Sequence, residues 1–460
     1  MRAHVVLRMA LRFTSLLERY LPDAFVFALV ATMLALGLGW LWAGASWGTM
    51  LDGWGKGFFS LVGFTLQMSL IIILGHVVAS AEAVARLLDR LAGLSKTAKG
   101  AVAQVALLAM LSSWLNWGFS LVFSAMLART IARRFAERGQ DIDYRALAAA
   151  SFLGLGSIWA QGLSGSAALQ MATPSALPPG LHGHGIPLSQ TIFLWQSFAS
   201  VGIELVVVTL VVWLIAPSEP HATTAASLGL SLQEVTSPPP SPTELRPGER
   251  PEHSPWLSLS FVALASGYLI HSLCQAPSLL EAINLNTINL TLLTLGALLH
   301  RTPARLQRAF ATATPAVWGV ILQFPFYGGI AGILASAGLN ALIADLFVGA
   351  ASQATLPPLV ALYSLLLGIF VPSGGSKWLI EAPYVLAAAE RLHVHSGWMV
   401  AVYDLGEALA NLVQPFWMLP VLGIFHLKAR DVMGYTVLVF LVLTPLVLLL
   451  TYALGLTLRG

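Results

Sequence analysis

The strongest constraint in this sequence is an internal repeat. When the first half of the 460-residue chain is laid over the second at an offset of 256 positions, roughly sixty residues align without a gap. Leu and Ala matches are common by chance in an apolar chain, so the polar and glycine identities carry the alignment. They include Gly63 with Gly319, Gln67 with Gln323, Asp89 with Asp345, Gly93 with Gly349 and Gly118 with Gly374. In a membrane protein, an internal repeat is the structural basis of alternating access.

Composition places the chain in a membrane. Charged residues make up 10% of it and the mean hydropathy is +0.77, whereas soluble domains contain about 25% charged residues. The apolar run 23–43 follows a basic stretch, is long enough to span, and lacks a convincing cleavage site, so we interpret it as the first transmembrane helix and not as a signal peptide. The single cysteine, Cys274, excludes an internal disulfide framework.

Nine apolar segments are long enough to cross a bilayer. They lie at 23–43, 57–80, 145–175, 189–216, 256–274, 283–299, 311–337, 398–427 and 432–458. Two further apolar blocks, 100–132 and 357–390, are broken at their centres by Asn116-Trp117-Gly118 and by Pro372-Ser373-Gly374-Gly375, which a continuous helix disfavours. We predict that each block is a re-entrant helical hairpin, one in each copy of the repeat.

The distribution of Lys and Arg predicts opposite orientations for the two copies, because these residues gather on the cytoplasmic side. With the N-terminus inside, the segment 81–99 lies inside and carries four basic residues, whereas its repeat partner 337–356 lies outside and carries none. Arg391 is the one exception. We therefore predict an inverted repeat with a cytoplasmic N-terminus and a C-terminus outside.

The predicted fold is an all-α polytopic membrane protein with about nine full crossings and two hairpins. The first repeat covers 1–216, with its hairpin at 100–132 and a broken helix at 145–175; the second covers 279–460, with its hairpin at 357–390 and a broken helix at 398–427; 256–274 is an unpaired extra crossing. Between the halves, 217–255 is rich in Pro, Ser and Thr and should be a disordered cytoplasmic linker. A regulatory or partner-binding segment is the alternative.

Irregular backbone at membrane depth is tolerated only where it lines a cavity or is buried in protein, so the breaks are candidate binding sites. The crossings after the hairpins are also broken, at 162–166 and 411–415. Each hairpin tip precedes a half-helix, whose N-terminus attracts an anion. We predict a carboxylate pocket between the tips, and the alternative is that Gly and Ser only permit close helix packing. The candidate substrate-binding residues are Asn116, Gly118, Ser120, Ser164, Ser166, Ser373, Gly374, Gly375, Ser376, Lys377, Asn411 and Gln414.

Ionisable residues at membrane depth are functional candidates. Lys377 directly follows the second tip and can pair with an anionic substrate, or it can form a self-neutralising pair with Glu381 four residues later. Glu407, Glu381 and Asp404 are candidates for a coupling proton or Na⁺, although Asp404 lies nearer the end of its segment and should be solvated.

Other polar residues in apolar segments are harder to interpret. A coupling Na⁺ could lie near Asn116 and Asn411, and no cofactor or dedicated metal site is expected. Glu204 lies inside an apolar crossing, and the sequence gives it neither a partner nor a role. Aromatic residues such as Trp117 and Trp159 flank the breaks and should be packing residues or walls for an apolar part of the substrate.

Several short motifs resemble the short-chain fatty acid transporter family, the bacterial carriers associated with acetoacetate and butyrate uptake. They are Asn116-Trp117-Gly118-Phe119, Ser164-Gly165-Ser166 with Ala172-Thr173-Pro174, Asn286-Thr287-Ile288-Asn289-Leu290, Gln323-Phe324-Pro325-Phe326-Tyr327, Val371-Pro372-Ser373-Gly374-Gly375, and Asn411 with Gln414-Pro415-Phe416-Trp417. The resemblance runs nearly end to end and implies an elevator-type carrier, commonly a homodimer, in the bacterial inner membrane. The chain departs from the family at Ser376, Lys377 and Glu381.

The sequence thus favours a secondary carrier for short-chain monocarboxylates, driven by H⁺ or Na⁺, whose partners are the carboxylate, the ion and the lipid bilayer. A dicarboxylate or amino-acid carrier of the same fold is the alternative, because Lys377 would suit a second carboxylate. An ion channel or an intramembrane enzyme is disfavoured, since no ring-forming motif, nucleophile–base pair or metal-ligand cluster is evident. No nucleic-acid partner is expected.

Overall fold

The computed structural model describes residues 24–178, 181, 183, 185–217, 222–232, 246–276, 282–370 and 374–458. These residues form helices and loops, with no strand among them. Ser373 lies outside the described residues, and only the backbone of Ser376 is described. The predicted all-helical class is confirmed.

The described residues of the first half form nine α-helices before the linker. They are α2 (Ala24–Leu41), α3 (Trp47–Ser60), α4 (Val62–Ala79), α5 (Glu82–Ala92), α6 (Ala98–Leu115), α7 (Trp117–Glu137), α8 (Tyr144–Phe152), α9 (Ser166–Met171) and α10 (Trp195–Ile215). The short 3-10 helix η1 (Ile158–Gln161) lies between α8 and α9, and the short 3-10 helix η2 (Pro174–Ala176) follows α9.

The second half of the described chain repeats much of this order. Its helices are α11 (Pro255–Gln275), α12 (Leu285–His300), α13 (Pro303–Ala313), α14 (Trp318–Ser336), α15 (Leu339–Ala350), α16 (Leu356–Phe370), α17 (Gly374–Arg391), α18 (Ser396–Asn411), α19 (Leu419–Phe425) and α20 (Ala429–Gly455). The 3-10 helix η8 (Phe416–Met418) separates α18 from α19.

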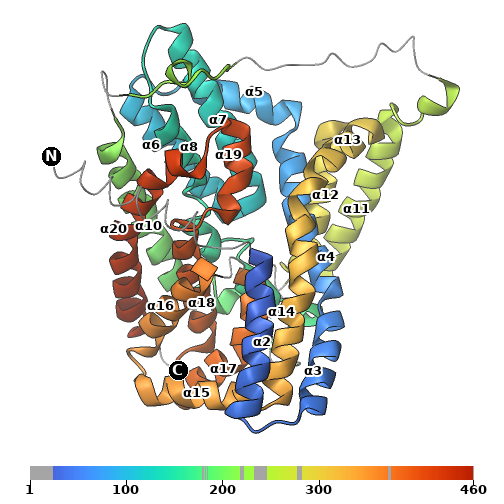
Figure 1. Cartoon of the computed structure of the whole chain (residues 1–460). Helices are drawn as coiled ribbons and strands as arrows, with labels where there is room; N and C mark the ends of the chain where they lie inside the picture. Colours follow the sequence, from blue (N-terminus) through green and yellow to red (C-terminus); the bar gives the residue numbers. More distant parts are fainter. Residues whose placement is uncertain are drawn as a thin grey trace.

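Helix bounds follow the 256-position offset. The offset carries α4 onto 318–335, where α14 lies, and α7 onto 373–393, where α17 lies. The repeat-equivalent segments 81–99 and 337–356 contain the paired helices α5 and α15. Figure 1 shows α5 near one end of the molecule and α15 at the opposite end.

Six helical stretches of the described residues are long and apolar enough to cross a membrane, seven if the bent pair α18 and α19 counts as one span. Nine crossings were predicted from the sequence. One reason for the difference is that the predicted crossing 145–175 is divided into α8, η1 and α9, none longer than 9 residues. Another is that α12 has only 16 residues. The first arm of the predicted hairpin 100–132, α6, is itself long and apolar enough to span.

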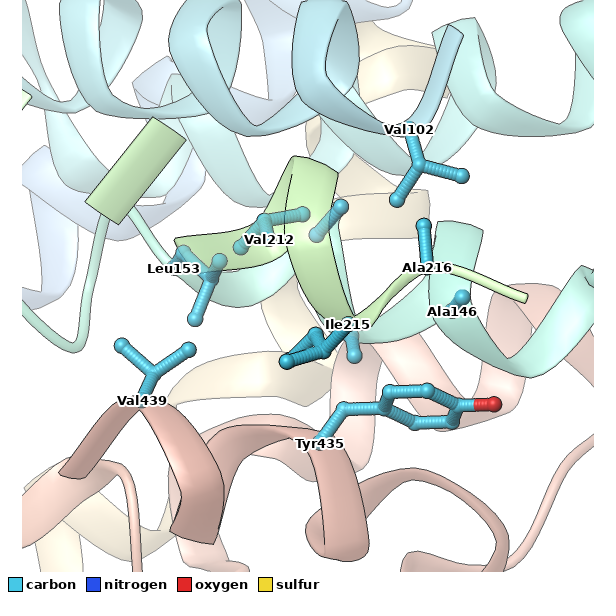
Figure 2. A pocket seen from close by; sticks show the side chains of 10 residues that line it. Val102, Ala146, Leu153, Val212, Ile215, Ala216, Tyr435 and Val439 are labelled. Carbon is cyan, nitrogen blue, oxygen red and sulfur yellow. The ribbon is translucent and has the colours of Figure 1, made fainter. Parts of the chain in front are cut away.

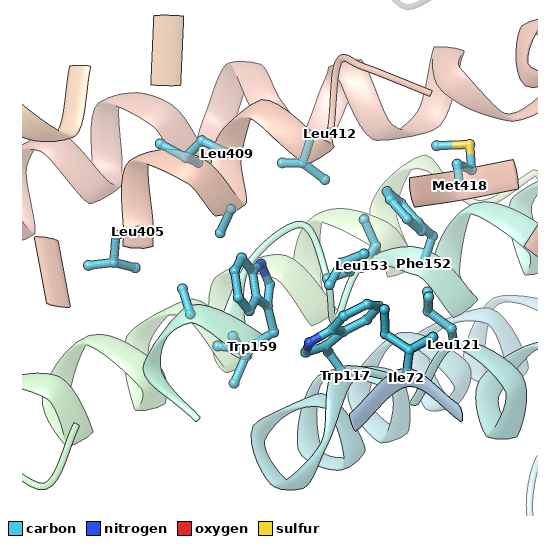
Figure 3. Packing of buried hydrophobic residues seen from close by; sticks show 14 of the residues in the cluster. Ile72, Trp117, Leu121, Phe152, Leu153, Trp159, Leu405, Leu409, Leu412 and Met418 are labelled. Carbon is cyan, nitrogen blue, oxygen red and sulfur yellow. The ribbon is translucent and has the colours of Figure 1, made fainter. Parts of the chain in front are cut away.

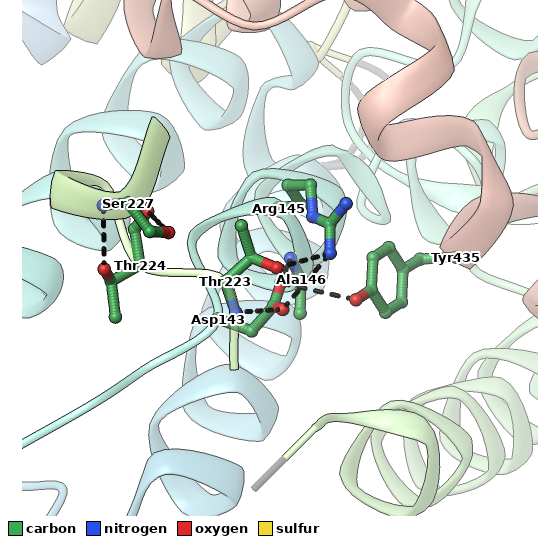
Figure 4. A network of polar contacts seen from close by, with 7 residues as sticks. All are labelled: Asp143, Arg145, Ala146, Thr223, Thr224, Ser227 and Tyr435. Atoms are coloured by element: carbon green, nitrogen blue, oxygen red, sulfur yellow. Dashed lines mark hydrogen bonds and ion pairs between the residues drawn. The ribbon is translucent and has the colours of Figure 1, made fainter. Parts of the chain in front are cut away.

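Part of the predicted linker makes defined contacts with the rest of the protein. Residues 222–232 fold back onto the start of α8, as Figure 4 shows. There the carboxylate of Asp143 caps α8 by accepting from Ala146 N at 2.8 Å and also accepts from Thr223 N at 2.9 Å. Arg145 donates to Thr223 Oγ1. The buried carboxylate needs these donors, and the linker supplies one of them.

The core lies where the two halves meet. Helix α4 packs on α7 and α12, α16 packs on α18, and the broken segments α9 and η1 pack on α18. Figure 3 shows Trp117 and Trp159 of the first half in one layer of side chains with Leu405, Leu409 and Leu412 of α18. The irregular segments are therefore enclosed by protein, which satisfies the requirement for non-helical backbone at this depth.

Candidate functional site

A cavity lies between the breaks of the two halves. The cavity is small in this conformation, with a volume of about 30 Å³. Its walls are Met68, Trp117, Leu155, Trp159, Ser166, Val320, Phe324, Gly374, Gly375, Glu407, Asn411 and Trp417. Five of these residues, Ser166, Gly374, Gly375, Asn411 and Glu407, are candidate substrate-binding or coupling residues from the sequence, and Trp117 and Trp159 were expected to be packing or wall residues. The cavity is mostly apolar, with its polar groups contributed by a few positions, as is usual for a small-molecule site.

The second hairpin presents its tip glycines to this cavity. A Cβ atom on Gly374 would lie 3.1 Å from the ring of Trp159 and 3.2 Å from both Asp404 Oδ1 and Glu407 Cγ. A Cβ on Gly375 would lie 3.2 Å from Phe64 and 3.3 Å from Ser166. Glycine thus permits the start of the 18-residue helix α17 to reach the cavity wall. The first N–H groups of a helix have no intrahelical acceptor, so this end can receive an anion.

Two indole groups in the wall offer further hydrogen-bond donors. The Nε1 atoms of Trp117 and Trp159 are buried and have no acceptor among the described residues. Figure 3 shows the two rings lying near each other. From sequence these residues were expected to supply packing or apolar surface, and their donor role was missed, because only the fold reveals that the N–H groups lack partners.

Lys377 pairs within the protein. Its Nζ lies 2.6 Å from Glu407 Oε2 and donates to Ser364 O at 2.8 Å. The sequence paired Lys377 with the substrate or with Glu381 and did not name Glu407. Glu407 lies on the neighbouring helix α18, 30 positions after Lys377, so only tertiary packing brings the two residues together.

Asp404 is completely buried, which corrects the expectation that it is solvated. Its Oδ2 accepts from Ala167 N at 2.9 Å, and its Oδ1 has no partner among the described residues. Glu381 is also buried, and its Oε2 is likewise without a described hydrogen-bond partner. One ammonium group and three carboxyl groups thus share the interior of the second half.

The first hairpin uses its polar residues to hold itself together. Asn116 caps α7, since its Oδ1 accepts from Phe119 N at 2.7 Å. Ser120 donates to Ala109 O at 2.7 Å, and Ser164 accepts from Trp117 N at 2.9 Å. Gly118 packs against α4, where its Cβ would lie 3.3 Å from Ile72 Cα. None of these four predicted substrate ligands is among the residues lining the cavity.

The break after α18 is stabilised by hydrogen bonds of two side-chain amides within it, those of Asn411 and Gln414. Asn411 donates from Nδ2 to Leu155 O at 3.2 Å while also lining the cavity. Gln414 donates to Asn411 Oδ1 at 2.8 Å and accepts from Phe416 N at 2.7 Å, so it acts on the site through Asn411. Across the described residues no group of three or more His, Cys, Asp or Glu side chains could hold a metal ion.

Comparison with known proteins gives consistent matches along the chain. Residues 5–454 match the family model described as "Short chain fatty acid transporter". A protein of Escherichia coli (strain K12), provisionally named a short-chain fatty acid transporter, is 36% identical over 427 residues, covering 92% of this chain and 94% of the relative. A protein of the same provisional name from Haemophilus influenzae is 30% identical over 451 residues, covering 95% and 98%.

Two solved transporter structures share the fold. The Alcanivorax borkumensis YdaH transporter superposes with a TM-score of 0.58 at 18% identity, covering 94% of this chain and 97% of that one. Neisseria gonorrhoeae MtrF, described in a class of antimetabolite efflux pumps, superposes with a TM-score of 0.58 at 15% identity, covering 97% and 96%. At these identities the likeness concerns the fold.

Proposed function

The chain belongs to the short-chain fatty acid transporter family, and we propose that it carries short-chain monocarboxylates of the butyrate and acetoacetate type across the bacterial cytoplasmic membrane. It is a membrane transporter and not an enzyme. The main support for a short-chain monocarboxylate as the substrate is the cavity between the hairpin tip and the broken helices.

The groups that line the cavity suit one carboxylate with a short apolar tail, and the cavity, about 30 Å³ in this conformation, must widen to hold one. The N–H groups at the start of α17 and the free indole N–H groups of Trp117 and Trp159 can donate to the two carboxylate oxygens. Met68 and Phe324 offer apolar surface for the chain. A dicarboxylate would need a second cation, and Lys377 is engaged by Glu407 and Ser364.

The carboxyl groups around the site favour coupling to a cation. A substrate carboxylate beside Gly374 would approach Asp404 Oδ1, and two like charges at short range in a poorly hydrated interior repel strongly. A proton or Na⁺ bound at Asp404, Glu407 or Glu381 removes this repulsion. Substrate and cation would therefore bind together, which is the basis of symport.

Contacts between repeat-equivalent residues support an inverted repeat built around the site. Asn411 donates to the carbonyl of Leu155, the residue 256 positions earlier, and Leu412 packs where a Cβ on its equivalent Gly156 would stand. Equivalent residues touch only near an axis that relates the two copies. We propose an elevator-type movement of hairpins and broken helices in a homodimer, with the N-terminus cytoplasmic and the C-terminus outside.

A larger opening offers a route to the site. It is lined by α3, α14 and η2, includes Lys56, Gly57 and Ser175, and has a volume of about 470 Å³. Phe64 lines this opening and stacks on Phe324 of the cavity, with ring centroids 5.8 Å apart. The pair separates the opening from the cavity, so opening it would admit the substrate.

Uptake of labelled butyrate into proteoliposomes tests this function. We expect accumulation under an imposed pH or Na⁺ gradient, and competition by acetoacetate but not by succinate or amino acids. Competition by succinate equal to that by butyrate would favour the dicarboxylate alternative, and absence of carboxylate uptake under either gradient would reject the proposal.

Membrane orientation has a separate test. Single cysteines placed in α5 and α15 of a Cys274-free protein should label from opposite sides of the membrane. The reason is that 81–99 contains four basic residues, whereas 337–356 contains none. Labelling of both from one side would reject the inverted repeat.

A further inference from the structure

Glu204 is a buried acid that the substrate site does not use. It lies near the middle of the 21-residue helix α10 and has 0% of its surface exposed. At 1.5 Å per residue it is about 14 Å from the start of the helix and about 16 Å from its end. If α10 spans the membrane, Glu204 is close to the bilayer centre, where an ionisable residue is a functional candidate.

The partners of Glu204 are neutral and bind only one of its oxygens. Gln161 Nε2 and Ser200 Oγ each donate to Oε1 at 2.8 Å. The other oxygen, Oε2, is buried and has no partner among the described residues.

Charged and titratable groups on the neighbouring helices are engaged elsewhere or lie near helix ends. Helices α6 and α20 and the 3-10 helix η1 pack against α10. Of these, η1 has no charged residue, α6 has Lys99, and α20 has Arg430, Asp431, Tyr435 and Tyr452. Lys99 lies over the ring of Trp213, 5.7 Å from its centroid, and Tyr435 donates to Asp143. Among the described residues, no ion pair or hydrogen bond joins any of these groups to Glu204.

A buried carboxylate with no cation is unfavourable, whereas a carboxylic acid in the same place is neutral. We propose that Glu204 is a proton-binding site, separate from the substrate cavity, and that it loads and releases one proton in each transport cycle. Its role in the cycle rests on the proposed carboxylate transport.

A polar stripe leads to Glu204 from one end of α10. Gln196, Ser200 and Glu204 lie on successive turns of its buried face. Gln196 donates to Thr457, which is exposed beyond the end of α20. A proton entering at Thr457 therefore meets polar groups at each turn before it reaches the carboxyl group.

Toward the other end of α10 the same face becomes apolar. Val208 and Val212 follow Glu204, and a small cavity beyond them is lined by residues such as Val102, Ile215 and Val439, as Figure 2 shows. The hydroxyl of Tyr435, in the same lining, is already bonded to Asp143. Water in such a cavity would lack polar partners. On the buried face of α10 the polar side chains therefore lie on the N-terminal side of Glu204 and the apolar ones on its C-terminal side, which favours proton entry from the N-terminal end.

Gln161 connects the proton site to the substrate cavity. It lies two residues after Trp159, whose ring lines the cavity, in the same 3-10 helix η1. An ionised Glu204 accepts from the amide N–H of Gln161, whereas a protonated Glu204 can donate to Gln161 Oε1, which has no described partner here. Rotation of the Gln161 amide would serve both states. Proton binding would thereby change the bonding of the segment that carries Trp159.

The test compares Glu204→Gln, which fixes the side chain in a neutral form of equal size, with Thr209→Val, which removes a nearby α10 hydroxyl outside the stripe. Reversal of butyrate flux in proteoliposomes at stepped pH gradients gives the number of protons moved per carboxylate. We expect Glu204→Gln to lower this number by one while butyrate exchange continues, and Thr209→Val to leave it unchanged. An unchanged number in Glu204→Gln would overturn the proposal.

Infrared spectroscopy of the purified protein tests the site without transport. One protonated carboxyl band of the wild type should be missing from the spectrum of Glu204→Gln, and the same band should be shifted in Ser200→Ala, which removes one donor to Oε1, while bands of other protonated carboxyl groups stay in place. If Glu204→Gln does not fold, a Ser200→Ala spectrum with no shifted carboxyl band would overturn the proposal. Failure of the wild type to exchange butyrate would instead reject the transport function and leave the infrared result to decide the proton site.

Discussion

At the tip of the first hairpin Gly118 packs against the backbone of α4, whereas at the equivalent position of the second hairpin Gly374 faces Trp159, Asp404 and Glu407 across the cavity. The difference continues beyond the tips. The positions equivalent to Lys377, Glu381, Asp404 and Glu407 in the first half are Leu121, Ala125, Ala148 and Ser151. All four are buried, and none is ionisable.

The two equivalent hairpins therefore differ in what their polar residues do. The first hairpin satisfies its irregular backbone internally, with Asn116 and Ser164 as acceptors for the N–H groups at its break. The second places charged groups under its tip and leaves Asp404 Oδ1 without a described partner. We infer that the first half mainly supports the site and the second half carries most of its charge chemistry.

The largest effect should come from adding a side chain at the second tip. Gly374→Val would push a Cβ and two methyl groups into atoms about 3.1 to 3.2 Å from the Cβ position, so we expect butyrate uptake to fall to background while the protein stays folded. The matched change Gly118→Val meets helix backbone instead and should lower stability by about 1–3 kcal/mol. Thermal midpoints in detergent and uptake rates separate the two outcomes. Full uptake by Gly374→Val would show that this tip is not part of the site.

Breaking the buried ion pair should have the next largest effect. Lys377→Met leaves Glu407 buried beside no ammonium group, and we expect a loss of about 3–5 kcal/mol of stability. The double variant Lys377→Met/Glu407→Gln removes both charges and should recover most of that loss. At the equivalent position in the first half, Leu121→Met should change stability by less than about 1.5 kcal/mol. A stable Lys377→Met single variant would contradict the pairing.

Removing one indole donor should have a smaller effect, confined to substrate affinity. Trp159→Phe keeps an aromatic ring but loses the N–H group in the cavity wall, so we expect the KM for butyrate to rise about tenfold. Trp114→Phe is the matched control, because its indole N–H is also buried without a described partner but does not line the cavity. Equal KM changes in the two variants would show that the cavity indoles do not bind the carboxylate.

The smallest effect should come from Ser120 in the first hairpin. Ser120→Ala removes the hydrogen bond to Ala109 O and should cost about 1 kcal/mol of stability with no change in KM. Ser166→Ala, in the cavity wall, should instead raise the KM with little change in the thermal midpoint. A raised KM in Ser120→Ala would return the first tip to the substrate site.

The sequence by itself determined the helical class, the repeat and the positions of the breaks. These are local properties, since a long apolar run favours a helix and Asn116 or the Gly374-Gly375 pair disfavours its continuation. Because the repeat fixes equivalent elements 256 positions apart, the bounds of α7 and α17 could also be anticipated.

The tertiary structure alone decided which polar residues face the cavity and which hold the protein together. Lys377 meets Glu407 rather than Glu381, because neighbouring helices bring distant residues closer than one helical turn does. Asp404 is buried against α9 and accepts a hydrogen bond from Ala167 N. Glu204 accepts a hydrogen bond from Gln161, which lies 43 positions earlier in the chain. Hydrogen-bond partners at such separations depend on how helices pack, and a periodic pattern in one segment carries no information about the segment that packs against it.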